Sequence, residues 1–177
     1  MKIGQARQAE AENDGIRIGI LTVSDRSWQG ERADLSGPAL VEMVTQQGWT
    51  VVKTAISADE LLSLQKILIT WADSNDLDVI LTTGGTGFAE RDVTPEATKG
   101  VIDRETPGLA EAMRAESLKV TPHAMLSRAI AGIRGKVLIV NLPGSPKAAR
   151  ENLEVLVQVL PHAVGLLRGD PKASERH

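Results

Sequence analysis

Short hydrophobic runs that alternate with helical patterns are the feature that most constrains the fold of this chain. Strand-like runs occupy residues 16–23, 49–56, 77–83 and 136–141. Between them lie segments whose apolar residues recur every three or four positions, as in an amphipathic helix. Strands separated by helices form right-handed βαβ crossovers, which place the strands parallel in one sheet. The sequence therefore predicts an α/β fold, a single three-layer α/β/α domain with a mostly parallel sheet.

Capping signals predict where the first two helices begin. Ser36 is a candidate N-cap, and the helix that follows it is expected to end before Gly48 at the C′ position. Ser57 and Glu60 have the spacing of a capping box, which predicts a second helix start. This start would place Asp59 in the first turn of that helix.

Three later helices are expected to begin where a proline follows Thr or Ser, because proline fits the first turn of a helix. The pairs are Thr94-Pro95, Thr106-Pro107 and Ser145-Pro146. They predict helices over 95–103 and 107–119, and one long helix from 146 whose apolar stripe runs to Leu167. Residues 119–135 are left open to an extra strand or hairpin.

The two ends of the chain differ in composition from its body. Residues 1–15 are polar after Ile3 and are predicted to form a flexible N-terminal arm, and 170–177 a flexible C-terminal tail. The domain is expected to span 16–169. The chain has no Cys, which excludes disulfides, thiolate metal sites and a Cys nucleophile. Its longest apolar run, 137–140, is too short for a membrane span, and no signal-peptide core precedes the domain, so we expect a cytoplasmic protein.

The charge balance argues against nucleic acid as a ligand. The chain carries 20 Lys and Arg against 23 Asp and Glu, and only 2% of its residues are aromatic. Binding to a polyanion normally needs a basic stripe with stacking aromatic side chains, and the sequence shows neither. A small phosphate compound remains a possible ligand if backbone amides and a few cations hold it locally.

Polar or glycine-rich residues follow three of the expected strands, at 22–25, 82–87 and 141–146. Ligands of open parallel sheets bind at the carboxyl ends of the strands. Gly84, Gly85 and Gly87 allow positive φ angles and a close approach of the backbone to phosphate, although a tight turn without a ligand is the alternative. Their spacing matches neither a P-loop nor a dinucleotide fingerprint.

The segment 141–147 ends a strand and begins a helix, whose N-terminus carries about half a positive charge. Ser145 can cap that helix or contact an anion. Lys147 lies in the first turn, where a cation is unfavourable, so its position suggests an anion nearby. An ordinary capped helix with a solvated Lys147 is the alternative.

Three aspartates near these strand ends are candidates for metal or phosphate chemistry. Asp92 closely follows the glycine loop, where a carboxylate could hold Mg²⁺ against phosphate oxygens. A turn aspartate that pairs with Arg91 or caps the next helix is the alternative. Asp59, in its predicted first turn, is favoured there by the helix dipole alone, and this interpretation prevails from the residues themselves. Asp25 closes the first strand.

Six segments, in their order along the chain, resemble the molybdopterin adenylyltransferase family: LTVSDR, SGPAL, LTTGGTGFAERDVTPEAT, ETPGLAEAMR, HAMLSRAIAGIRGK and NLPGSPK. Members of this family occur alone in bacteria and as the G domain of gephyrin. The resemblance covers about residues 16–170. It implies a three-layer α/β subunit, a homotrimer, and Mg²⁺-dependent transfer of AMP from ATP to the terminal phosphate of molybdopterin, with release of pyrophosphate.

The resemblance also implies roles for particular residues. The two functional aspartates of the family match Asp59 and Asp92, as catalytic or metal-positioning residues. The loop expected to hold the nucleotide phosphates is Gly84, Gly85, Thr86 and Gly87. The positions expected on or near the molybdopterin side are Ser24, Asp25, Thr94, Asn141, Pro143, Gly144, Ser145 and Lys147.

Two other classes of protein remain as alternatives to the enzyme. One is a binding module that holds molybdopterin without turnover, which the loss of either aspartate would favour; both are present. The other is a scaffold protein, which would need domains beyond this one. The resemblance further implies a molybdenum insertase that acts downstream on the product.

Overall fold

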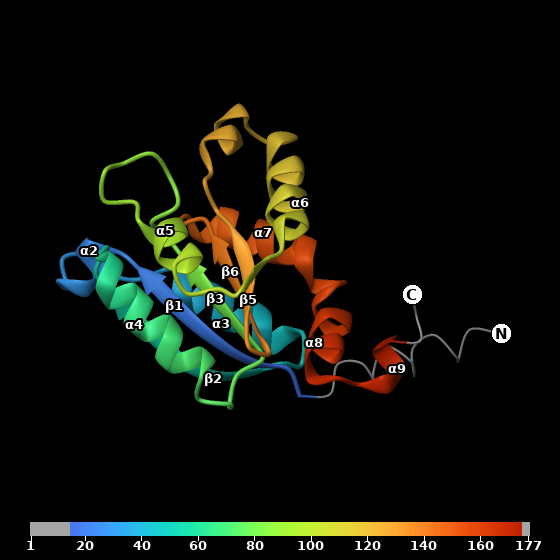
Figure 1. Ribbon diagram of the computed structural model, residues 1–177. Helices are drawn as coiled ribbons and strands as arrows, with labels where there is room; N and C mark the ends of the chain where they lie inside the picture. Colours follow the sequence, from blue (N-terminus) through green and yellow to red (C-terminus); the bar gives the residue numbers. More distant parts are fainter. Residues whose placement is uncertain (1–14, 175–177) are drawn as a thin grey trace.

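A six-stranded sheet in the order β2-β1-β3-β6-β5-β4 forms the centre of the structure, a computed structural model that describes residues 15–174 (Figure 1). The predicted N-terminal arm, apart from Gly15, lies outside the described residues. The strands are β1 (Arg17–Val23), β2 (Thr50–Ser57), β3 (Val79–Thr83), β4 (Arg104–Glu105), β5 (Ala131–Arg134) and β6 (Val137–Leu142). The strands β2, β1, β3 and β6 are parallel; β5 pairs antiparallel with β6, and β4 pairs antiparallel with β5 at that edge.

Helices cover both faces of this sheet. They are α2 (Asp25–Trp28), α3 (Ser36–Gln46), α4 (Leu61–Ala72), α5 (Thr94–Lys99), α6 (Pro107–Leu118), the 3₁₀ helix η1 (Pro122–Leu126), α7 (Pro146–Val157), α8 (Leu160–Arg168) and α9 (Pro171–Ser174). Successive strand residues point to opposite faces. Val79 and Leu81 therefore pack with α3, α6, α7 and α8, whereas Ile80 packs with α4 and α5. The predicted three-layer α/β fold with a mostly parallel sheet is confirmed.

The first two helix starts differ from the predicted ones. The helix α3 begins at Ser36 itself, with Leu35 at the N-cap position, and the carboxylate of Asp34 accepts the N–H groups of Ser36 and Gly37, each at 3.0 Å. Ser57 ends β2, and α4 begins only at Leu61, so the predicted capping box is wrong. Asp59 consequently lies in the connection between strand and helix, where its position reflects contacts to another loop and not the helix dipole.

Proline sets later boundaries that the apolar pattern alone missed. The predicted long helix is two helices, α7 and α8, because Pro161 has no N–H to donate to residue 157 and its ring crowds that carbonyl group. The helix predicted over 95–103 ends at Lys99.

The extra strand left open in residues 119–135 exists as β5 and forms a hairpin with β6. A short edge strand, β4, was not predicted, and α9 lies where a flexible tail was expected.

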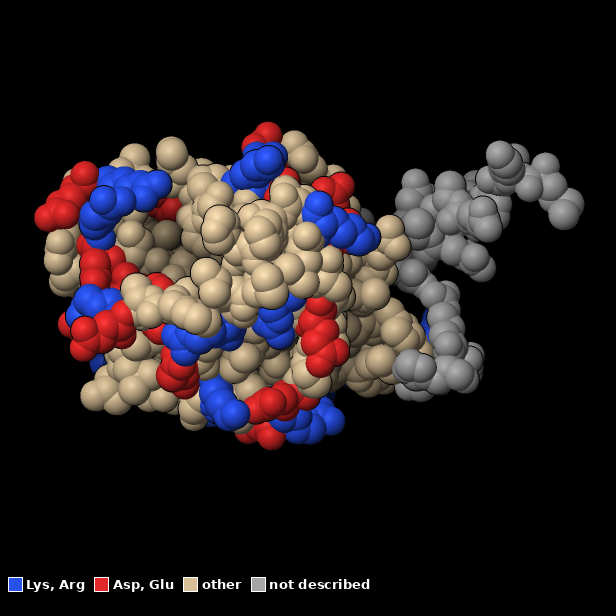
Figure 2. Space-filling model, turned by 90° about the horizontal axis from the view of Figure 1, so that it is seen from above, with Lys and Arg blue, Asp and Glu red and all other residues tan. Residues whose placement is uncertain are grey.

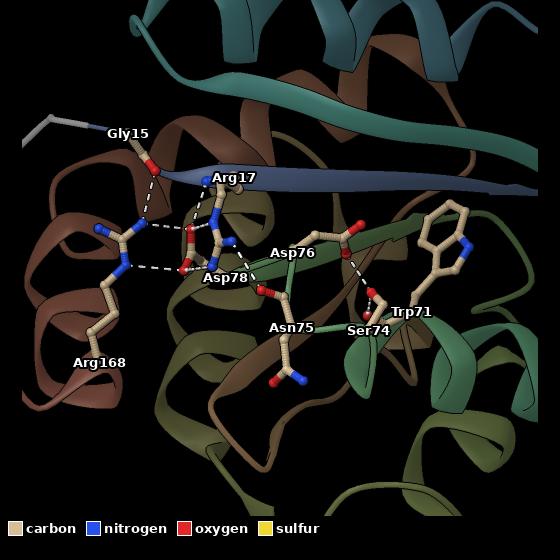
Figure 3. A network of polar contacts seen from close by, with 8 residues as sticks. All are labelled: Gly15, Arg17, Trp71, Ser74, Asn75, Asp76, Asp78 and Arg168. Carbon is tan, nitrogen blue, oxygen red and sulfur yellow. Dashed lines mark hydrogen bonds and ion pairs between the residues drawn. The ribbon is translucent and has the colours of Figure 1, made fainter.

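Asp78 ties three elements together at the amino ends of the parallel strands (Figure 3). Its Oδ2 accepts the backbone N–H of Arg17 at 2.8 Å, and its Oδ1 accepts the Nε of Arg168 at 3.0 Å. Arg168, at the end of α8, also donates to the carbonyl of Gly15 at 2.8 Å. Burial raises the pKa of Asp78, but the hydrogen bonds from Arg168 and Arg17 outweigh burial and lower this pKa to about 2.

We predict that Asp78→Asn lowers the free energy of unfolding at pH 7 by roughly 2 kcal/mol, because the folded-state pKa lies below the usual value. A lowered pKa stabilises the fold above the unfolded-state value of 3.8, and this stabilisation is lost as the pH falls toward about 2. Urea unfolding at pH 7 and at pH 3 measures both effects, and the difference between variant and wild type should shrink at pH 3. The control is Asp76→Asn, which removes a more exposed carboxylate and should change stability little; an equal loss in the two variants would contradict the prediction.

Candidate functional site

A polar cavity of about 420 Å³ lies at the carboxyl ends of β1, β3 and β6. Seven of the predicted site residues line it: Ser24, Asp59, Gly84, Gly85, Asp92, Gly144 and Ser145. Seen from above in Figure 2, the surface is hollowed on the side where α2 and the 84–93 loop lie in Figure 1, and acidic and basic side chains border the hollow. The three segments that follow the strands in sequence therefore meet in one place.

The glycine turn after β3 is shaped by its contacts with the backbone of β1. Gly84 has φ +106°, and a Cβ there would lie 2.2 Å from the carbonyl oxygen of Val23. Gly85 has φ +64°, and its Cβ would lie 2.3 Å from the hydroxyl of Thr94. That hydroxyl donates to the carbonyl of Gly84 at 2.9 Å. Only glycine fits this turn, which brings the backbone of β3's end directly against the cavity.

We predict that Gly84→Ala destabilises the protein by at least about 2 kcal/mol, since it combines backbone strain with a clash against a carbonyl group. The matched control is Gly108→Ala in α6, where an added Cβ meets nothing within 4 Å. This control should be neutral or slightly stabilising. The measurement is the midpoint of thermal unfolding of both variants. Equal midpoints for the two would show that the turn tolerates a side chain.

A reciprocal pair of hydrogen bonds joins the connection that carries Asp59 to the start of α2. The carboxylate of Asp59 accepts the N–H of Asp25 at 2.8 Å, and that of Asp25 accepts the N–H of Asp59 at 3.0 Å. Arg91 reaches across from the 84–93 loop and pairs with the Asp25 carboxylate through Nε and, at 2.9 Å, through Nη2. Asp25 thus connects two loops, and its carboxylate already has three donors.

The two carboxylates of this pair have opposite electrostatic surroundings. The hydrogen bonds from Arg91 lower the pKa of Asp25 below its usual value. Burial raises the pKa of Asp59; the N–H of Asp25 opposes this rise, and the charges of Asp25 and Asp92 add to it. The charge of Arg91, which is paired with Asp25, also lowers the pKa of Asp59, but no ion pair to Asp59 itself occurs among the described residues. A positive charge in the cavity would favour the ionised form of Asp59.

Asp92 closes the exposed loop that follows the glycine turn. Its carboxylate accepts the N–H of Ala89 at 2.9 Å, and the carbonyl of Ala89 accepts the N–H of Asp92 at 2.9 Å. Asp59 and Asp92 line the same cavity. No cluster of three His, Asp or Glu side chains in residues 15–174 could hold a metal by itself. Two carboxylates suit Mg²⁺ only when phosphate oxygens and water complete its coordination.

The N-terminus of α7 opens onto the same cavity. Ser145 is its N-cap, as predicted, and its hydroxyl accepts the N–H of Ala148 at 3.5 Å. Lys147 is highly exposed and lies 3.8 Å from Glu151 on the next turn, and it does not line the cavity. The ordinary interpretation of Lys147, a solvated cation at a capped helix, therefore matches its surroundings better than the anion contact does.

Six further predicted residues lie next to the cavity without lining it. Thr94 and Asn141 are buried: the Thr94 hydroxyl bonds to the glycine turn, and the Asn141 amide donates to the hydroxyls of Thr82 and Thr98 at 3.0 and 2.8 Å. The carboxylate of Asp25 is bound by Arg91 and by the N–H of Asp59. The other three, Thr86, Gly87 and Pro143, line a second cavity of about 270 Å³, mainly apolar, between α6, η1 and the start of α7.

Sequence reasoning missed Asp34 and Arg32, which also line the polar cavity. Besides accepting the first N–H groups of α3, the Asp34 carboxylate accepts the hydroxyl of Thr22 at 2.7 Å and so joins α3 to the end of β1. A signal for Asp34 was in the sequence, because an aspartate near a helix start commonly accepts the first backbone N–H groups of the helix. No signal distinguished Arg32 from other surface arginines.

These features define an α/β protein of the class that binds its ligand beyond the carboxyl ends of parallel strands. A family model described as "Probable molybdopterin binding domain" matches residues 19–162. The chain belongs to this family, which confirms the resemblance found in the sequence.

Curated relatives and a solved structure agree with the family assignment. The chain is 46% identical to a molybdopterin adenylyltransferase of Helicobacter pylori over 88% of its own length and 89% of the relative. It is 43% identical to gephyrin of Dictyostelium discoideum over 98% of its length, but spans only 25% of that protein. The structure of the molybdopterin biosynthesis enzyme MoaB from Thermus thermophilus superposes with a TM-score of 0.83 at 52% identity, covering 88% of this chain and 98% of the other.

Proposed function

We propose that this chain transfers AMP from ATP to the terminal phosphate of molybdopterin, as a molybdopterin adenylyltransferase of molybdenum cofactor biosynthesis. The observation that carries the proposal is that Asp59 and Asp92 share one cavity with the glycine turn and the N-terminus of α7. Nucleotidyl transfer needs positioning and charge neutralisation more than a covalent nucleophile, and this cavity offers both. The identity to curated adenylyltransferases supports the substrates.

In the proposed reaction, an oxygen of the molybdopterin phosphate attacks the α-phosphorus of ATP. The new phosphoanhydride bond forms as the bond from the α-phosphorus to the bridging oxygen breaks, and pyrophosphate leaves with the electron pair. The backbone at Gly84 and Gly85, which line the polar cavity, would lie against the nucleotide phosphates, and Thr86 and Gly87 continue this loop beside the cavity. Ser24, Gly144 and Ser145 orient the acceptor, and the α7 N-terminus favours its negative charge. Asn141 and Thr94 act indirectly, by holding the turn and the strand ends.

The donor set of the cavity fits Mg²⁺, the implied cofactor. Asp59 has one carboxylate oxygen, Oδ1, without a hydrogen bond in the described part of the chain, and Asp92 lies close enough for its charge to raise the pKa of Asp59. Hard carboxylate oxygens beside phosphate are the ligands that Mg²⁺ prefers. Bound there, the ion would neutralise charge on the phosphate oxygens. The aspartates themselves hold position and supply negative charge.

We predict that Asp92→Ala lowers AMP transfer by at least about 100-fold, and that Asp59→Asn also lowers it severely while molybdopterin still binds. The amide of Asn keeps the shape of the side chain but cannot supply negative charge to Mg²⁺. The measurement compares molybdopterin binding with ATP-dependent formation of adenylylated product. Glu111→Gln, at an exposed carboxylate on α6, is the control. Normal product formation by Asp59→Asn would show that Asp59 has only a structural role. Normal product formation by Asp92→Ala would show that Asp92 does not take part in the reaction.

A non-catalytic module that holds molybdopterin, or a scaffold of the same fold, is the second candidate. The observation in favour of this candidate is the match to gephyrin, a longer protein of which this chain spans 25%. The same assay separates the candidates, because a module or scaffold binds molybdopterin and forms no adenylylated product at any Mg²⁺ concentration.

We further expect a homotrimer, and predict a mass near three times 18.9 kDa by light scattering at micromolar concentration. Exposed apolar side chains at the end of α6 and along η1 support association, because exposed apolar surface can mark an interface; they are Leu118, Val120, Met125 and Leu126. A monomer mass would contradict this prediction.

The downstream partner of the protein and its location in the cell remain predictions. The adenylylated product would pass to a molybdenum insertase, a separate protein, and the reaction would take place in the cytoplasm. No helix in residues 15–174 is long and apolar enough to cross a membrane.

A further inference from the structure

Arg128 contacts both ends of the loop that carries Asp92. Its backbone N–H donates to the carbonyl of Thr86 at 2.9 Å, and its Nε donates to the carbonyl of Gly87 at 2.7 Å. Its Nη2 donates to the carbonyl of Asp92, and its Nη1 pairs with Glu96 on α5. Arg128 lies between η1 and β5, far from the loop in the sequence, and brings its beginning and its end together at one guanidinium group.

Besides Arg128, the ion pair of Arg91 with Asp25 ties this loop to the start of α2. Residues 88–91 are all exposed, and Phe88 keeps 69% of its surface accessible, so the hydrophobic core does not fix their positions. The turn between Ala89 and Asp92 is closed by local hydrogen bonds, which do not tie it to other elements. The Arg128 contacts anchor the backbone of Asp92 itself, whereas the side chain of the preceding Arg91 is tied to Asp25.

Only an arginine can make this set of contacts. The planar guanidinium presents five N–H donors in a fixed fork, which here serve two carbonyl groups and one carboxylate at once. A lysine at the same position keeps the charge but presents one compact ammonium, which cannot reach all three acceptors. A lysine variant therefore tests the planar arrangement of the guanidinium donors separately from their positive charge.

We propose that Arg128 is a positioning residue for the reaction at this site, which holds the Asp92 carboxylate in the cavity by clamping the 87–92 loop. The proposal rests on the proposed function for its catalytic part. Arg128 does not line the polar cavity, so it acts through the loop and not on the substrate. Its loss should change the rate of transfer and the requirement for Mg²⁺ more than the binding of molybdopterin.

The test compares Arg128→Lys with Glu96→Gln. The second variant removes the ion pair of the same guanidinium but leaves the bonds to Gly87 and Asp92. In Arg128→Lys, we expect kcat to fall roughly 10- to 100-fold, as small misplacements of catalytic groups do. The Mg²⁺ concentration for half-maximal rate should rise, while the Kd for molybdopterin changes less than about twofold. Glu96→Gln should stay close to wild type in all three.

A second readout needs no turnover. Chymotrypsin cleavage after Phe88 reports the opening of the loop, and it should be roughly tenfold faster in Arg128→Lys at an unchanged thermal midpoint of unfolding. Arg128→Gln, which keeps one amide donor, should behave in the same way and serves if the lysine variant folds poorly. Wild-type cleavage and wild-type kcat in these variants would overturn the proposal, as would an equal defect in Glu96→Gln. If the wild-type protein itself forms no product, the proposed function fails, while the cleavage ratio still decides whether Arg128 clamps the loop.

Discussion

The close contact of three strand ends, with no side chains between them, is the constraint on which the site depends. Gly84 lies so near the carbonyl of Val23 that a Cβ could not fit, and a Cβ on Gly144 would lie 3.2 Å from the Cα of Gly84. The backbones that end β1, β3 and β6 are therefore packed directly against one another. Because these backbones meet, the polar residues that follow each strand surround one small cavity and are not spread along the sheet edge.

The buried Asp78 and the half-buried Asp59, at opposite edges of the sheet, show how the same side chain serves stability or chemistry. Asp78, at the amino edge, is satisfied by two arginines, which hold its pKa near 2. Asp59, at the carboxyl edge, receives a backbone N–H, and burial raises its pKa. The first carboxylate has its counter-ions within the fold, which suits a structural tie. The second is left with unbalanced negative charge in a cavity, which suits a site that takes a cation with its substrate.

The sequence predicted the layers, the parallel strands and the meeting of three loops, because hydrophobic periodicity and strand order depend on local patterns. It misplaced Asp59, since a capping-box spacing looks the same whether the first serine caps a helix or ends a strand, as Ser57 does. The prediction of one long helix from residue 146 was wrong because the apolar stripe continues across Pro161, where the helix breaks. The roles of Asp25 and Arg128 could not be predicted, because both depend on partners far away in the chain.

Few cations near the cavity are free to balance the phosphates of the proposed reaction. Arg91 is bound to Asp25, and Arg128 to the loop carbonyls and Glu96. Among the cavity-lining residues, Arg32 is the cation for which the described contacts show no ion pair. One arginine cannot balance two aspartates and the phosphates of two substrates. Backbone amides of the glycine turn and the α7 N-terminus supply partial positive charge, and in the proposed reaction Mg²⁺ would supply the remainder, so substrate, metal and loop position are expected to depend on one another.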